Sequence, residues 1–75
     1  MTLFEGKSEC DYIITGIYVE YAIERRLEAL GLNEDTIVRI LTRKKNGAMI
    51  LKVRGTRLAI GKDIASGIEV KEANK

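Results

Sequence analysis

The sequence predicts a small, mainly β domain with one internal helix, in which five short strands form a partly open barrel. Its 75 residues are enough for one domain and too few for two. Several short runs alternate apolar with polar residues or are rich in β-branched ones, which is typical of strands. A flat five-stranded sheet would expose two edges, which curling into a barrel removes. We expect residues 1–75 to form a single domain, with 71–75 as a polar tail.

The first predicted strand follows a short helical turn near the N-terminus. Residues 2–5 favour that turn, because Thr2 is a good N-cap and Glu5 stands three residues later, as in a capping box. Residues 10–19 mix β-branched and aromatic side chains, which favours a strand. Gly16 indicates a bulge or a bend within it.

Residues 20–30 form the one clear predicted helix. Ile23, Leu27 and Leu30 recur at helical spacing and make one apolar stripe. Gly31 follows at the position where glycine commonly ends a helix. We expect this helix, inserted between the first two strands, to plug one end of the barrel.

The second half of the chain is predicted as four strands joined by tight turns, at residues 36–43, 49–54, 57–60 and 68–70. Asn46-Gly47 is a strong hairpin signal, because both residues tolerate a positive φ. A second tight turn is expected at Gly55-Thr56. Residues 62–66 are predicted as a single helical turn.

The composition excludes several classes of site. With no histidine and only Cys10 as a cysteine, the chain cannot form a Cys/His metal site, a histidine-based triad or an internal disulfide. A domain this small also leaves little of its core to be hollowed out for a substrate. We therefore expect a binding module without catalysis and without a cofactor.

The ends and the apolar runs of the chain predict a location. No apolar run approaches the roughly 20 residues that span a bilayer. The N-terminus lacks the basic and apolar regions of a signal peptide. The sequence thus predicts a cytoplasmic protein without direct membrane insertion.

Charge is divided unevenly along the chain. Residues 36–62 contain eight basic side chains and no acidic one: Arg39, Arg43, Lys44, Lys45, Lys52, Arg54, Arg57 and Lys62. The remainder holds all eleven acidic residues. Such a division suggests a polar interface with a partner of complementary charge.

Six basic residues are the candidate partner-binding residues: Arg25, Arg26, Lys44, Lys45, Arg54 and Arg57. Arg54 and Arg57 flank a turn at Gly55, where they either anchor a partner or are simply solvated, and the sequence favours neither reading.

The other candidates have simpler structural explanations. Arg25 can pair with Glu28 on the helix surface. Lys44 and Lys45 suit a solvated hairpin tip. A small basic barrel that binds RNA or DNA is the alternative function, but residues 36–62 contain no aromatic side chain for base stacking, which makes nucleic acid an unlikely partner.

Two motifs carry a resemblance to a known family. Residues 25–32, RRLEALGL, are similar to the RRLxxMGL helix end of the FeoA family of ferrous-iron transport accessory proteins, with Leu30 in place of the usual methionine. Residues 53–60, VRGTRLAI, resemble its VRGxxLAL strand turn. The resemblance extends from Leu3 to Val70. The chain departs from the pattern at residues 33–35, where Pro-Gly is usual, and in its shorter, more basic central hairpin.

The resemblance implies an SH3-like barrel and a partner. FeoA proteins are encoded beside FeoB, a membrane iron transporter with a cytoplasmic GTPase domain, and are thought to bind and modulate it. The same barrel occurs in iron-dependent repressors, where it makes protein–protein contacts. We therefore expect a FeoB-like transporter as the partner. Three points stay open: self-association, direct binding of Fe²⁺, and whether the chain activates or inhibits its partner.

Overall fold

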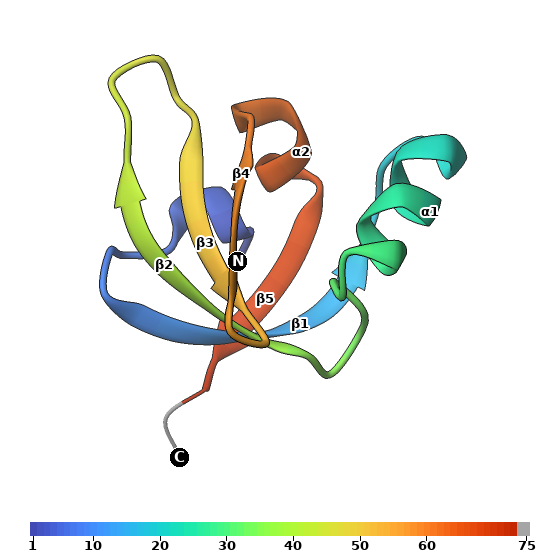
Figure 1. Cartoon of the computed structure of the whole chain (residues 1–75), viewed down its shortest axis with the longest axis horizontal. Coiled ribbons are helices and arrows are strands. Elements are labelled where there is room, and N and C mark those ends of the chain that lie inside the picture. The colour runs from blue at the N-terminus through green and yellow to red at the C-terminus, as the bar shows by residue number, and fades with distance from the viewer. Residues whose placement is uncertain (74–75) are drawn as a thin grey trace.

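The computed structural model describes residues 1–73, which form one curled, five-stranded antiparallel sheet with short helices around it (Figure 1). The elements are η1 (Leu3–Glu5), β1 (Cys10–Ile17), α1 (Tyr21–Ala29), β2 (Ile37–Arg43), β3 (Met49–Val53), β4 (Thr56–Ile60), α2 (Lys62–Ser66) and β5 (Ile68–Glu72). The strand order is β4-β3-β2-β1-β5. The predicted fold class, a mainly β five-stranded barrel with a helix between its first two strands, is confirmed.

The core lies inside the curl and is built from alternate residues of the strands. Met49, Leu51 and Val53 of β3 are all buried, while Lys52 between them is exposed, as the alternation predicts. The buried apolar side chains are Leu3, Tyr12, Ile14, Leu27, Leu32, Val38, Ile40, Met49, Leu51, Val53, Ile60, Ala65, Ile68 and Val70.

β1 is the strand that lets the sheet curl. It pairs with β2 through residues 10–13 and with β5 through residues 12–17. The pairing with β5 shifts register between Ile14 and Gly16, so the bulge predicted at Gly16 is present. A bulge bends its strand and increases the local twist, which allows β1 to pair with β2 on one side and with β5 on the other as the sheet curls.

The two edges of the sheet differ. The backbone N–H of Val70 in β5 donates to the carbonyl of Met1 at 2.8 Å, and Thr2 forms an isolated bridge with Glu69. The N-terminal residues therefore cover the β5 edge. At the other end of the sheet, β4 pairs with β3, and among residues 1–73 no backbone hydrogen bond reaches its second edge.

Both tight turns form, one of them a residue earlier than expected. Gly47 has φ 96° in the predicted hairpin between β2 and β3. The turn between β3 and β4 was expected at Gly55-Thr56 but lies at Arg54-Gly55, with φ values of 52° and 83°. Two successive positive φ values define a type I′ turn, whose twist matches that of the flanking strands.

The apolar stripe and the position of α1 both differ from what the sequence predicted. Leu30 is 51% exposed instead of continuing the buried stripe, and the helix stands beside the barrel instead of plugging its end (Figure 1). The helix ends with Gly31 at φ 97°, and the backbone N–H of Leu32 bonds to the carbonyl of Leu27 at 2.9 Å. This bonding is a Schellman motif, in which a residue beyond the helix packs back onto its last turn. Leu32 therefore fills the buried place that Leu30 was expected to take.

The C-terminal end is more ordered than expected. The tail was predicted to begin at residue 71, but β5 continues through Lys71 to Glu72 because it pairs with β1 as far as Tyr12. Residues 74–75 of the predicted tail lie outside the described residues.

Candidate functional site

Three cations form a row across the outer face of the sheet. Arg39 of β2 lies directly opposite Lys52 of β3, which lies directly opposite Arg57 of β4. Side chains of directly opposed residues lie on the same face of a sheet, about 5 Å apart at Cβ. All three residues are exposed. We call Arg39, Lys52 and Arg57 the cationic row.

The core and the turn geometry place this row. Val38 and Ile40 point inward in β2, so Arg39 between them points outward. The Arg54-Gly55 turn fixes the register of β3 and β4, which sets Lys52 opposite Arg57. The row is therefore a consequence of alternation and of hairpin register together.

The row carries more positive charge than the fold neutralises. Arg39 Nη1 lies 3.1 Å from Asp11 Oδ1 on the next strand, β1. Among residues 1–73, neither Lys52 nor Arg57 has an acidic side chain within ion-pairing distance. Like charges directly opposite one another on a sheet are destabilising, so the arrangement costs stability in the isolated domain. An anionic partner would remove that cost.

Two further cations of the basic segment act within the fold. The Arg43 guanidinium donates hydrogen bonds to the carbonyls of Phe4 and Gly6, and its carbon lies 5.1 Å from the centre of the Phe4 ring. Lys62 Nζ lies 5.5 Å from the same ring centre. These contacts tie the N-terminal turn to β2 and α2.

The predicted site residues at the turns lie at opposite ends of β3. Lys44 and Lys45 lie at the β2–β3 hairpin, while Arg54 forms the β3–β4 turn at the other end of the strand (Figure 1). Arg54 lies close to Gly31, where an added Cβ would be 3.3 Å from its Cδ. Of the six candidates, only Arg57 belongs to the cationic row.

The two candidates predicted on the helix, Arg25 and Arg26, lie on α1 and not on either hairpin. Arg25 was a candidate with helix-surface pairing, for example to Glu28, as its simpler explanation. In the structure its Nη1 donates to the Tyr21 hydroxyl at 3.0 Å, and its guanidinium lies over the Tyr21 ring. Arg26 is exposed on α1. The structure thus distributes the six candidates over α1, the hairpin tip and the β3–β4 region.

Arg39 and Lys52 were not among the candidate residues. A signal for them was present, because both lie at outward positions of strands that the sequence predicted. Their cross-strand alignment depends on the turn and on the register shift between Ile40 and Thr42, which the alternation alone does not give.

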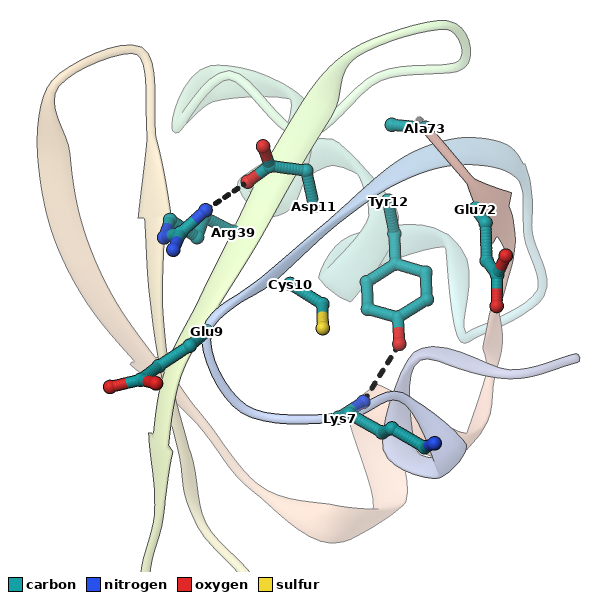
Figure 2. A pocket seen from close by; sticks show the side chains of 8 residues that line it. All are labelled: Lys7, Glu9, Cys10, Asp11, Tyr12, Arg39, Glu72 and Ala73. Carbon is teal, nitrogen blue, oxygen red and sulfur yellow. Dashed lines mark hydrogen bonds and ion pairs between the residues drawn. The ribbon is translucent and has the colours of Figure 1, made fainter. Parts of the chain in front are cut away.

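A recess of about 360 Å³ opens beside β1, although a domain of this size was expected to have little room for one (Figure 2). Its lining residues are Lys7, Glu9, Cys10, Asp11, Tyr12, Arg39, Glu72 and Ala73. The Cys10 thiol and the Tyr12 ring point into it, and the Tyr12 hydroxyl accepts a hydrogen bond from the backbone N–H of Lys7 at 2.8 Å. Charges of both signs line the recess. Nowhere in residues 1–73 are three or more Cys, Asp or Glu side chains grouped so that they would hold a metal ion.

The five antiparallel strands and the short helices define a small SH3-like domain. A family model for the FeoA domain matches residues 1–72, and the chain therefore belongs to the FeoA domain family, whose domains are non-catalytic and associated with iron transport. No curated protein sequence matches the chain. Neither α1 nor α2 has the length and apolar character needed to cross a membrane, a statement that covers the described residues.

Solved structures agree with this assignment. The chain is similar to the solution structure of a FeoA protein from Chlorobium tepidum, with a TM-score of 0.93 and 28% identity over 99% of this chain and 71% of that one. It is also similar to the crystal structure of an iron uptake regulatory protein, FeoA, with a TM-score of 0.88 and 26% identity over 97% of both chains. A third similar structure is ScaR with bound Cd²⁺, with a TM-score of 0.86 and 27% identity over 96% of this chain but only 35% of that one.

Proposed function

We propose that this chain is an accessory protein of bacterial ferrous-iron uptake that binds the cytoplasmic GTPase domain of a FeoB-like transporter. The observation that carries the proposal is the FeoA domain over residues 1–72. The protein would act in the cytoplasm, where that GTPase domain lies.

The surface of the domain supports a docking role. Lys52 and Arg57 are exposed side by side without an acidic neighbour in the described chain, so an acidic surface of a partner would gain two ion pairs. Complementary charge chiefly raises the rate and the specificity of association. Apolar contacts beside the row would have to supply part of the affinity, since exposed ion pairs contribute little on their own.

The proposal is tested by titrating the ¹⁵N-labelled protein with the purified cytoplasmic domain of FeoB from the same organism. We expect amide shifts in β2, β3 and β4, measured separately with GDP and with a GTP analogue bound. A weak transient complex would have a dissociation constant of about 100 µM. Absence of any amide shift at a FeoB-domain concentration several times that value would reject the proposal.

Nucleic acid is the alternative partner, favoured by one observation, the three adjacent cations of the row. Phosphate contacts weaken steeply with salt, by a factor that grows with every phosphate neutralised. Fluorescence anisotropy with labelled single- and double-stranded oligonucleotides measures the affinity at low and at physiological salt. We expect no binding at physiological salt, because no aromatic residue lies in the segment 36–62 to stack on bases.

A further inference from the structure

The sheet has one edge that the chain covers and one that it leaves open. Met1 and Thr2 bond to the outer edge of β5. β4, at the other end of the strand order, has no backbone partner on its outer edge among residues 1–73. An open strand edge presents unpaired N–H and C=O groups and is a template for pairing with another chain.

The hairpin register identifies which groups are free. In a two-residue type I′ hairpin, the residues that flank the turn, here Val53 and Thr56, exchange both hydrogen bonds with each other. Bonded and non-bonded pairs then alternate along the ladder. Arg57 and Ala59 therefore belong to non-bonded pairs with β3 and direct their N–H and C=O groups to the open edge.

Little protects this edge. β4 has no bulge and no proline, and Arg57 and Ala59 are both exposed. The charge on Arg57 and the short length of the strand guard against pairing with a neutral segment.

We propose that the open edge of β4 binds an extended, acidic segment of a partner protein, which adds to the sheet as a further strand. The backbone of the segment would pair with Arg57 and Ala59, as in other cases of strand addition. Acidic side chains on the outer face of the segment would lie directly beside Arg57, so that an anion on the added strand stands next to the cationic row. The inference goes beyond the proposed function, because it specifies the backbone form and the charge of the bound segment, whichever protein supplies it.

Charge also argues against a second copy of this chain as the occupant. Pairing of two β4 edges would join two cationic rows in one continuous sheet, with Lys52 and Arg57 of both copies close together. Like charges across neighbouring strands are destabilising. A segment with carboxylates at alternate positions has the complementary pattern.

Short capped peptides test the proposal without any change to the protein. The first alternates glutamate with valine, the second carries N-methyl groups on the amides that would face β4, and the third has lysine in place of glutamate. We expect the first peptide to shift the amide signals of Arg57 and Ala59 and to slow their hydrogen exchange about tenfold near 90% occupancy, because only the free protein exchanges. The other two should leave both amides unchanged.

Four results would overturn the proposal. If the N-methylated peptide bound as tightly as the first peptide, the peptide backbone would not be pairing with β4. If the lysine peptide bound as tightly as the first peptide, charge would not determine which segment binds. Absence of any effect of the first peptide at millimolar concentration, or sedimentation of the free protein as a dimer that the peptide does not dissociate, would rule out the proposed occupant.

A matched pair of variants adds a test on the protein side. Ala59→Pro removes the outward N–H without removing a ladder bond to β3, and proline is tolerated on edge strands. Ala59→Val keeps that N–H and favours the strand. We expect the proline variant to bind the first peptide at least about fivefold more weakly than the valine variant; equal affinity would contradict edge pairing. Circular dichroism spectra of both variants verify that the sheet is retained.

Discussion

Replacing Gly55 by alanine tests whether the Arg54-Gly55 turn holds β4 in register. Gly55 has φ 83°, and an added Cβ would meet no atom within 4 Å. The cost of the substitution is therefore backbone conformation and not crowding. A left-handed conformation costs a residue with a Cβ roughly 1–2 kcal/mol. Alanine also restricts the unfolded chain, which returns about 0.4–1 kcal/mol, so we expect a net loss of about 1 kcal/mol.

Gly61→Ala is the matched control. Gly61 is equally open, with no atom within 4 Å of an added Cβ, but its φ is −84°. Alanine adopts that conformation without strain. Gly61 is the N-cap of α2, where alanine is less favourable than glycine by roughly 0.5–1 kcal/mol. Restriction of the unfolded chain returns about 0.4–1 kcal/mol, so the control should remain within about 0.5 kcal/mol of the parent protein.

Urea denaturation followed by circular dichroism measures both variants, and an unchanged slope with urea verifies that the two-state comparison holds. Gly55→Asn should lie between alanine and the parent, since asparagine tolerates a positive φ. A Gly55→Ala variant as stable as the parent, or a Gly61→Ala variant that loses as much stability as Gly55→Ala, would show that the positive φ at Gly55 is not what stabilises the turn.

Three other predictions concern the core and the recess. Leu51 is fully buried in β3, so Leu51→Ala should cost about 2–5 kcal/mol in urea denaturation; a loss below about 1 kcal/mol would mean that the core is not packed as described. Tyr12→Phe removes the acceptor of the Lys7 N–H and should cost about 1 kcal/mol, with faster hydrogen exchange at the Lys7 amide; unchanged exchange would contradict that bond. Asp11→Asn breaks an exposed ion pair with Arg39 and should cost less than about 1 kcal/mol, a difference that must shrink in high salt if charge is the cause.

Local patterns in the sequence predicted the elements of the fold well. The alternation of Met49, Leu51 and Val53 identified the inward face of β3, and Asn46-Gly47 identified the central hairpin. These features depend on residues close together in the chain. They are therefore visible without knowledge of the tertiary structure.

The errors lie at the ends of helices and strands, where one local rule overrides another. Leu30 continued the helical spacing, but Gly31 ended the helix and brought Leu32 into the core instead. Arg54 was taken as the last residue of a strand, yet it adopts a positive φ and belongs to the turn. Non-glycine residues at positive φ are uncommon, so the sequence alone favoured the other assignment.

The candidate surface was predicted only in part, because it depends on strand register. Arg57 was identified, while its neighbours Lys52 and Arg39 were not. Lys44 and Lys45 are adjacent charges in the sequence, but they lie at the far end of β3 from the Arg54 turn. Proximity along the chain was a poor guide to proximity on the sheet.

If the cationic row docks on the GTPase domain of a FeoB-like transporter, removing its charge should weaken that complex. The most direct test compares, by isothermal titration calorimetry at physiological salt, the Lys52→Gln/Arg57→Gln double variant with Lys44→Gln/Lys45→Gln, which removes the same charge from the hairpin tip. We expect the first variant to bind FeoB's cytoplasmic domain about tenfold more weakly than the parent, about 1.4 kcal/mol, and the second to stay within about twofold. Equal losses for the two variants, or a larger loss for the hairpin variant, would contradict docking through the cationic row.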